Sequence, residues 1–311
     1  MIVSSKVASN AGNQTMLDYL AGRFSYLQRT MWRQRIAEGR ILHNGTPCKE
    51  DTMVYGGDTV AYDMPDFAEP PANTCYSIIY EDDWIVGINK PANLLVHRSG
   101  RSFRSNLIYH LRHIHTPHYP TAHAVNRLDR ETSGVVLAAK DRETLKALQK
   151  DFAARRIHKQ YHAVVAGLLH PPCGTIRLAI GRARESKIAY RFAVNGEKAK
   201  EAHTDYAVEN TIGKTYSLVR LTPHTGRTHQ LRVHMAAIGH TIAGDKLYGM
   251  DDDTFIKWRN NPASVASRLN FSRQALHCTK VTFTHPHTGK LCEIAAPIAD
   301  DIMKFISDAG K

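Results

Sequence analysis

The sequence predicts an α+β protein built on a mixed sheet, with a small α/β module before it. Alternating apolar and polar residues, which indicate half-buried strands, recur along the chain. They occupy residues 76–80, 202–208, 217–221 and 280–284. Few helical patterns lie between these segments, and strands and helices do not alternate as strictly as they do in a parallel α/β fold.

The chain divides at a proline-rich stretch. Residues 65–73 contain three prolines and two acids and show no periodicity, which is typical of a linker. The 311-residue chain is long enough for one large domain and a small one. We expect an N-terminal module over residues 1–64, a linker over 65–75 and a main domain over 76–311.

The N-terminal module opens with two helical patterns, over residues 17–24 and 28–38. The second stops at Gly39, a residue type that commonly ends helices. Residues 40–45 predict a strand that runs into an Asn-Gly hairpin turn, and 56–62 predict a second turn and strand.

Three arginines of this module are candidate contacts to phosphates. If the second pattern is a helix, Arg29, Arg33 and Arg40 fall at offsets of 4 and 11 and share one face. Such a face can hold phosphates and position a protein on a nucleic acid without reading bases. Because the net charge of the module is about zero, its binding depends on that face.

The main domain begins with a strand over residues 76–80. Asp141 is a residue type that caps helices, and the apolar residues after it recur at helical spacing. Residues 227–238 predict a further helix, whose N-terminus could face an anion.

The charge balance indicates a polyanionic partner. Lys and Arg number 41 and Asp and Glu 29, so the net charge is +12, and cations that meet phosphates supply affinity for nucleic acid. No acidic residue lies between Asp83 and Asp129, which indicates a path for a phosphate backbone. The cations of this segment include Arg101, Arg104 and Arg127, which we expect to contact RNA.

Histidines in the same segment raise a metal site as an alternative. They are His110, His113, His115 and His118, with His229 and His234 downstream. The chain has no His-Glu-x-x-His motif, and no cysteine or carboxylate lies within the cluster. We therefore expect no metal ion, and near pH 6 these histidines would add positive charge instead.

The cysteines and the hydropathy favour a cytoplasmic protein. Five cysteines, none in a Cys-x-x-Cys pair, do not form the framework of a disulfide-stabilised protein. The first 14 residues lack the apolar core of a secretory signal, and no apolar stretch reaches about 18 residues. We expect a cytoplasmic monomer that does not enter a membrane.

The segment 126–134, Asn-Arg-Leu-Asp-Arg-Glu-Thr-Ser-Gly, is the strongest candidate for catalysis. It places Asp129 between Arg127 and Arg130, just before an apolar run over 135–139 that predicts a buried strand. Neighbouring cations keep an aspartate ionised, so that it can act as a nucleophile or a base. The alternative is a loop aspartate in a surface ion pair.

This segment resembles the Arg-Leu-Asp-x-x-Thr-Ser-Gly signature of the RluA family of RNA pseudouridine synthases. Five further segments resemble motifs of that family, in the family's order. They lie at residues 89–97, 159–167, 221–234, 239–249 and 276–297. The resemblance covers roughly residues 78–300, with one departure, since most members have histidine where this chain has Asn126. We interpret Asn126 as a structural hydrogen-bonding site.

The resemblance implies the roles of three residues. Asp129 would be the catalytic carboxylate, Tyr161 would stack on the base and help to remove the C5 proton, and Arg227 would pair with Asp129. No cofactor and no metal would be needed. Attack at C1′, attack at C6 and a glycal route all remain open.

The resemblance also implies the fold and the substrate. We expect the pseudouridine synthase fold, with a mixed, largely antiparallel central sheet. The N-terminal module resembles the S4 RNA-binding domain, and family members with such an arm usually modify large-subunit ribosomal RNA. Transfer RNA is the alternative substrate. The competing classes are a non-catalytic RNA-binding protein with this fold and a metal-dependent hydrolase.

Overall fold

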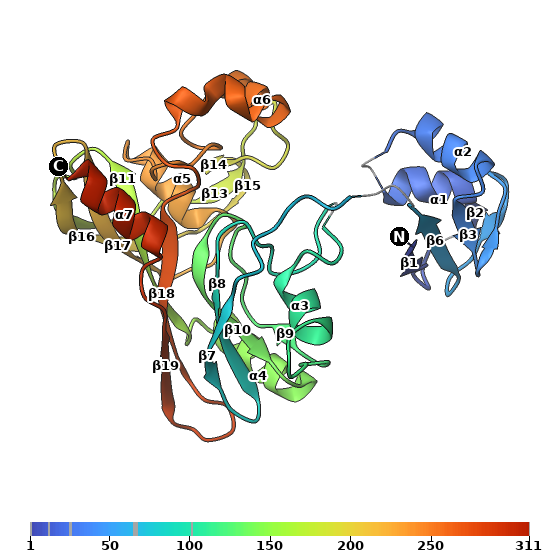
Figure 1. Ribbon diagram of the computed structural model, residues 1–311, viewed down its shortest axis with the longest axis horizontal. Helices are drawn as coiled ribbons and strands as arrows, with labels where there is room; N and C mark the ends of the chain where they lie inside the picture. The colour runs from blue at the N-terminus through green and yellow to red at the C-terminus, as the bar shows by residue number, and fades with distance from the viewer. Residues whose placement is uncertain (1, 12, 25–26, 65–67, 101, 311) are drawn as a thin grey trace. The chain divides into compact units, whose positions relative to one another are not determined.

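The structure is a computed structural model that describes residues 2–11, 13–24, 27–64, 68–100 and 102–310 (Figure 1). The chain forms two compact units, Met1–Pro70 and Pro71–Lys311. No helix of the described residues is both long and apolar enough to cross a membrane.

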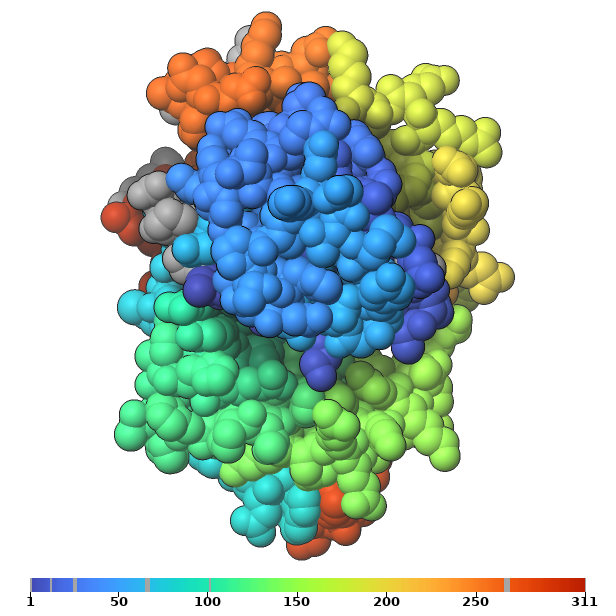
Figure 2. All heavy atoms as spheres, turned by 90° about the vertical axis from the view of Figure 1, so that its right-hand side faces the viewer, coloured from blue at the N-terminus to red at the C-terminus, as the bar shows by residue number. Residues whose placement is uncertain are grey.

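The N-terminal unit combines a four-stranded antiparallel sheet with two helices. The sheet order is β1 (Ile2–Lys6), β6 (Thr59–Asp63), β3 (Ile41–His43) and β4 (Thr46–Pro47). The helices are α1 (Met16–Arg23) and α2 (Arg29–Ala37), and β2 (Gln14–Thr15) pairs with β5 (Met53–Val54). Figure 2 shows the residues of this unit, in blue, closely packed against one another.

Local sequence signals set the connections of this unit. Asn44 and Gly45 both have positive φ, 49° and 91°, and join β3 to β4, so the predicted Asn-Gly turn is confirmed. α2 ends where Gly39 adopts a φ of 69°. The indole of Trp32 is fully buried and packs on Tyr62 of the sheet, with ring centroids 5.4 Å apart.

The expectation that Arg40 shares one helical face with Arg29 and Arg33 is wrong. α2 ends at Ala37, and the left-handed turn at Gly39 sends the chain into β3 before a further helical turn can form. Only Arg29 and Arg33 of the three arginines therefore belong to this helix.

The second unit is built on a ten-stranded sheet. Its main path runs β12 (Cys173–Ile176), β16 (Thr204–Ile212), β17 (Tyr216–Pro223), β11 (His158–Ala166), β18 (Leu276–Thr284), β10 (Ser133–Ala139), β8 (Ile85–Lys90) and β7 (Ser77–Glu81). β19 (Leu291–Ala295) pairs with β18, and β9 (His123–Ala124) pairs with β10. The pair β10–β18 is parallel and the other pairs are antiparallel. The predicted mixed, largely antiparallel α+β sheet is confirmed.

Helices and a small sheet surround this central sheet (Figure 1). The helices are α3 (Leu107–His113), α4 (Arg142–Ala153), α5 (Gln230–Ala237), α6 (Asp252–Asn260) and α7 (Asp300–Ala309), with a 3-10 helix at Pro262–Arg268. The small sheet has the order β14 (Phe192–Val194), β13 (Ile180–Arg182) and β15 (Glu197–Lys200). α4 begins as predicted, because the Asp141 carboxylate accepts a hydrogen bond from the Thr144 amide.

The centre of the sheet places the loop that carries Asp129. All seven residues of β10 are buried, as the apolar run predicted. At its start Gly134 has a φ of 111°, and a Cβ there would lie 2.1 Å from the carbonyl oxygen of Cys278. Only glycine allows β10 to approach β18 so closely, and this contact anchors the loop that enters β10.

Candidate active site

A buried lysine holds the loop of Asp129. The side chain of Lys90 is fully buried at the end of β8. Its Nζ donates to the carbonyl oxygens of Pro91 at 2.7 Å, Leu94 at 2.9 Å and Arg130 at 3.4 Å. Burial lowers the pKa of Lys90 to about 7. The residue after Asp129 is thus tied to the turn that follows β8.

One guanidinium joins Asp129 to a second carboxylate. Arg232 Nη1 donates to Asp129 Oδ2 at 2.8 Å. Its Nε and Nη2 bind the two oxygens of Asp245 at 2.6 and 2.9 Å. The side chains of Asp245 and Arg232 are 1% and 9% exposed, whereas that of Asp129 is 26% exposed. Asp245 therefore fixes the arginine from within, and Asp129 presents its carboxylate at the surface of a pocket.

This arrangement keeps Asp129 ionised. Burial by itself raises the pKa of the Asp129 carboxyl, but the neighbouring cations and their hydrogen bonds, with Arg232 first among them and Arg127 adding to it, together outweigh burial, so the pKa lies below its usual range. His229 contributes no such charge at neutral pH, because burial lowers its pKa to about 4. The histidine Nε2 lies 3.9 Å from Asp129 Oδ2, and its Nδ1 lies 2.8 Å from the Tyr248 hydroxyl.

The predicted pairing of Arg227 with Asp129 is wrong. Arg227 Nε donates instead to the Glu201 carbonyl oxygen at 2.9 Å, and Arg232 takes the predicted place. The reason is the start of α5, which begins at Gln230 rather than at residue 227. Arg227 therefore lies in the loop before the helix, while Arg232 lies on the helix face that packs inward.

The signal for Arg232 was present in the sequence. Arg232 belongs to the same motif, 221–234, as Arg227, and Asp245 in the next motif is a buried acid that needs a cation. Choosing between the two arginines required the helix register, which the sequence pattern placed three residues too early.

Asp129, Tyr161 and Arg227 line one pocket of about 410 Å³. Its walls come from the Asp129 loop, α4, β11 and the segment that leads into α5. The charged lining residues are the carboxylate of Asp129 and the cations of Arg127, Lys159, Arg227 and Arg232. An anionic ligand such as a nucleotide therefore finds several cations around a single carboxylate.

Tyr161 forms an apolar wall of this pocket. It is 8% exposed and lies on β11 at a register shift against β18, next to Gln160. Burial raises the pKa of its phenol well above the usual value. Tyr161 therefore enters the site as a neutral phenol.

A second cavity of about 670 Å³ meets the first at the carboxylate. Both cavities are lined by Arg127, Leu128, Asp129, His229 and Arg232. The second one extends past Lys246 and Trp258. A ligand longer than one nucleotide can therefore lie on both sides of Asp129.

The candidate RNA contacts have different surroundings. Arg127 lines both cavities at Asp129. The arginines of the N-terminal unit each pair with a carboxylate, Arg29 with Asp18 at 2.7 Å, Arg33 with Glu50 at 2.7 Å and Arg40 with Glu38 at 2.9 Å. Arg104 is exposed, and Arg101 lies outside the described residues.

Asn126, where most members of the resembled family have histidine, makes hydrogen bonds to the backbone, as expected of a structural hydrogen-bonding site. Its side-chain oxygen accepts from the Leu137 amide at 2.8 Å, and its side-chain nitrogen donates to the Val135 carbonyl oxygen at 3.4 Å. Both partners are backbone groups of β10, so the asparagine ties the loop to this strand.

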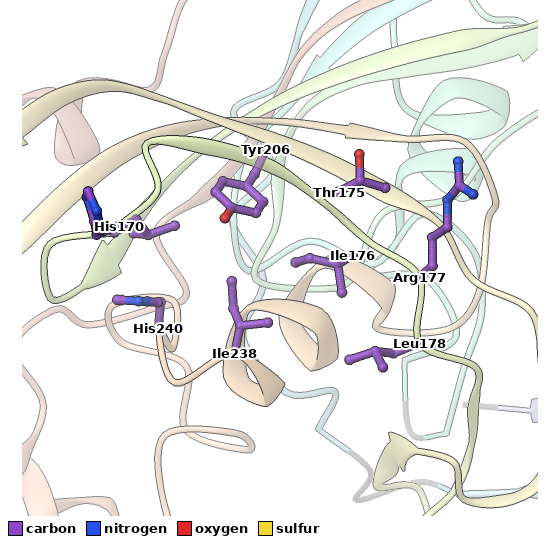
Figure 3. Close-up of a pocket in the computed structure, with 9 residues that line it drawn as sticks. His170, Thr175, Ile176, Arg177, Leu178, Tyr206, Ile238 and His240 are labelled. Carbon is purple, nitrogen blue, oxygen red and sulfur yellow. The ribbon is translucent and has the colours of Figure 1, made fainter.

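A further hollow of about 320 Å³ lies away from these residues (Figure 3). Tyr206 and Ile238 point toward each other across it, His170 and His240 also line it, and no carboxylate is among its lining residues. Its lining does not include Asp129, Tyr161 or Arg227, which all line the 410 Å³ pocket. We therefore do not assign catalysis to this hollow.

Comparisons with known proteins define the class of enzyme to which this fold and site belong. A model of the family described as RNA pseudouridylate synthase matches residues 84–237. The ribosomal large subunit pseudouridine synthase D of Xylella fastidiosa is 32% identical over 99% of this chain and 95% of its own length. An uncharacterized RNA pseudouridine synthase of Chlorobaculum parvum is 34% identical over 91% of this chain and 90% of its own length.

The solved structures agree. The human RNA pseudouridylate synthase domain containing 1 covers 74% of this chain and 86% of its own, with a TM-score of 0.57 and 27% identity. The chain belongs to the RNA pseudouridylate synthase family and is an RNA pseudouridine synthase, an isomerase. This confirms the predicted family and enzyme class. The matched span of the family model lies entirely within the second unit.

Proposed function

We propose that this enzyme isomerises uridines in large-subunit ribosomal RNA and that Asp129 is its catalytic carboxylate. The observation that carries the site is the carboxylate of Asp129, held by Arg232, in a pocket shared with Tyr161 and several cations. The ribosomal substrate rests on the names of relatives that match nearly the whole chain, such as synthase D of Xylella fastidiosa. Transfer RNA is the alternative.

The reaction needs an ionised carboxylate and no redox step. The bond between uridine N1 and ribose C1′ breaks, the base turns, C1′ joins C5, the C5 proton leaves, and N1 takes up a proton, so that the product is an isomer of the substrate. Arg232 and His229 both approach Oδ2 of Asp129. The other oxygen, Oδ1, is therefore the one assigned to the substrate, as nucleophile or base.

Tyr161 would stack on the turning base. Because burial keeps its phenol protonated at neutral pH, it can accept the C5 proton only if its own proton leaves in the same step. Asp129 lies in the same pocket and is the base able to receive that proton.

Arg127 and Arg227 would bind the phosphates of a nucleotide that has been flipped into the pocket. Both line it, and Arg227 directs part of its guanidinium to a backbone carbonyl rather than to Asp129. Within the described ranges, the ion pair of Asp129 is made by Arg232, which leaves both of these charges to a ligand. Flipping costs least in an unpaired loop, so a loop uridine is the expected target.

The N-terminal unit would act as an S4-like arm that anchors the enzyme on RNA. Arg29 and Arg33 hold carboxylates in exposed ion pairs and Arg40 in a partly exposed one, and such pairs contribute little to stability. A phosphate can replace such a partner with release of counterions. Arg101 and Arg104 would extend the contact in the second unit. Monomeric state and cytoplasmic location stay predictions.

Mapping pseudouridines in ribosomal and transfer RNA from cells with and without the gene tests the substrate. Sites in large-subunit RNA should disappear with the gene and return with the wild-type gene but not with Asp129→Asn. If only transfer RNA sites disappear, the ribosomal substrate is wrong and the isomerase stands. If the Asp129→Asn gene restores the sites, the assignment of the catalytic carboxylate is wrong.

A further inference from the structure

Two imidazoles and one carboxylate gather beside the pocket, outside the residues assigned to catalysis. His203 precedes β16, Asp205 lies on β16, and His224 follows β17. Residues two apart on a strand point to the same face, so His203 and Asp205 share one. The His224 amide donates to the His203 carbonyl oxygen at 2.9 Å, which places the two histidines opposite each other across the hairpin.

The side chains converge as metal ligands do. Nε2 of His203 lies 3.2 Å from Asp205 Oδ1, and Nε2 of His224 lies 2.6 Å from Asp205 Oδ2. The two rings stack with centroids 4.1 Å apart, and the three ligand atoms all lie within 4.8 Å of one another. Tetrahedral ligands bound at about 2.0–2.2 Å lie about 3.3–3.6 Å apart, so small side-chain rotations are enough.

A neighbouring residue orients the carboxylate. Thr175 on β12 stands opposite Asp205 in the strand register, and its hydroxyl donates to Asp205 Oδ1 at 2.7 Å. Figure 3 shows the Thr175 hydroxyl on the other side of these strands from the ring of Tyr206. Such an outer hydrogen bond fixes a metal-binding carboxylate.

We propose that His203, Asp205 and His224 bind a divalent transition-metal cation of the zinc class. Two imidazole nitrogens and one carboxylate oxygen suit Zn²⁺, Co²⁺ or Ni²⁺, whereas Mg²⁺ prefers oxygen ligands. The three side chains are 29%, 43% and 39% exposed, so an ion reaches them from solvent and a coordination position stays open. The inference holds whichever RNA is the substrate.

The predicted metal alternative lay elsewhere, in the histidine-rich segment 110–118. In the part of the chain that the structure describes, one group brings three potential metal-ligand atoms of histidine, cysteine or acidic side chains within 4.8 Å of one another. It consists of His203, Asp205 and His224. In the segment 110–118, the imidazole of His115 forms a hydrogen bond with Tyr76 instead, with its Nδ1 3.3 Å from the tyrosine hydroxyl.

A bound cation would fix the hairpin beside the active-site loop. It would link the start of β16 to the end of β17, and Thr225, Gly226 and Arg227, which follow His224 directly, line the pocket of Asp129. The Thr225 hydroxyl also accepts from the His203 amide at 3.0 Å. The cation would thus stiffen this segment without touching Asp129.

Zn²⁺ binding to the full chain tests the site. Protein stripped with chelator and freed of it is titrated with ZnCl₂ by calorimetry, and Co²⁺ absorption is recorded in parallel. Wild type should bind one equivalent. Asp205→Asn and the double variant H203A/H224A should lose that equivalent, and Thr175→Val should weaken it by about 10-fold to 100-fold.

The matched control is the double variant H113A/H118A, which removes two exposed histidines from the other segment and should still bind one equivalent. Circular dichroism checks that each variant folds. If H203A/H224A does not fold, the loss of binding in Asp205→Asn is the result that tests the site. The proposal is overturned if wild type binds no ion, if Asp205→Asn binds as wild type does, or if H113A/H118A loses the ion.

Discussion

Arg232 Nη1 lies 2.8 Å from Asp129 Oδ2, while the rest of the same guanidinium is held by Asp245. Asp129 is therefore positioned indirectly, through Arg232. A fully buried acid fixes the arginine, and the arginine fixes the carboxylate that faces the pocket. The chain uses its paired charges here to orient Asp129 and to keep it ionised, since the pKa of Asp129 lies below its usual range.

The first prediction separates the two arginines of this motif. Arg232→Gln removes the cation that lowers the pKa of Asp129, so the carboxyl should be protonated at higher pH. Because activity needs the ionised form, the acid limb of kcat/KM should move to higher pH and turnover should fall by at least about 100-fold. A pH series of tritium release from 5-tritiated uridine in RNA measures both.

Arg227→Gln is the matched control. Arg227 donates to the Glu201 carbonyl oxygen, so its loss should raise KM for RNA while the acid limb stays in place. An acid limb that moves in Arg227→Gln and not in Arg232→Gln would restore the pairing predicted from the sequence.

The second prediction concerns the stability conferred by Lys90. Burial lowers its pKa to about 7 from 10.5, so between these values the unfolded chain binds more protons than the folded one. Stability from this group therefore rises with pH over that window and is lowest below pH 7. Lys90→Met should flatten the rise, which urea unfolding of both proteins between pH 7 and 9.5 measures.

A second outcome is expected from the same variant. A methionine side chain has no donor for the Arg130 carbonyl oxygen, to which the lysine donates at 3.4 Å, so the loop of Asp129 should loosen and activity should fall. If Lys90→Met keeps both the slope of stability with pH and full activity, Lys90 does not hold this loop.

Local sequence signals predicted much of the fold. The apolar run 135–139 formed the central strand β10, Asp141 capped α4, and the Asn44-Gly45 pair made a hairpin turn. Each of these depends on residues close together in the chain. The Asp129 loop was likewise visible, because a run of polar and small residues leads into a buried strand.

The remaining features depend on contacts between distant residues. Which arginine meets Asp129 is decided by the start of α5, where His229 has a φ of 57° and Gln230 bonds back to Thr225. The histidines at 203 and 224 are 21 residues apart and meet only through the register of β16 and β17. In the sequence alone, the closely spaced histidines of residues 110–118 were the more visible candidate for a metal site.

The third prediction concerns the N-terminal unit. A protein that begins at Asn73 should fold, because Pro71–Lys311 is a compact unit. It should still isomerise a short RNA but bind large-subunit RNA more weakly. The slope of log affinity against log salt should become shallower by about 0.7 to 0.9 for each phosphate that the shortened protein no longer binds.

In the full chain, replacing Arg29 and Arg33 with alanine should reproduce part of that change. Arg156→Ala, which removes an exposed arginine at the end of α4, serves as the control and should leave the slope unchanged. A truncated protein that binds and modifies large-subunit RNA as well as the whole chain would show that the N-terminal unit is not an RNA anchor.

The last prediction concerns Asp129 itself. Asp129→Asn keeps the size of the side chain and an oxygen that can accept from Arg232, but it removes the charge. A structural ion pair that is a quarter exposed would lose little, and the folded variant would stay active. A catalytic carboxylate has no substitute, so turnover should fall by about 10³-fold or more. Release of tritium from 5-tritiated uridine reports turnover directly, because joining C5 to C1′ expels that atom.

Binding must be measured on the same preparation, since loss of charge next to Arg127 and Arg232 leaves the pocket more cationic. RNA affinity should therefore stay within a few-fold of wild type or increase. Asp245→Asn is the milder variant for comparison. It weakens the ion pair that holds Arg232 in place and leaves the carboxylate of Asp129 unchanged. It should reduce turnover less than Asp129→Asn does. Tritium release at the wild-type rate by folded Asp129→Asn would remove Asp129 from the catalytic role, whatever RNA is modified.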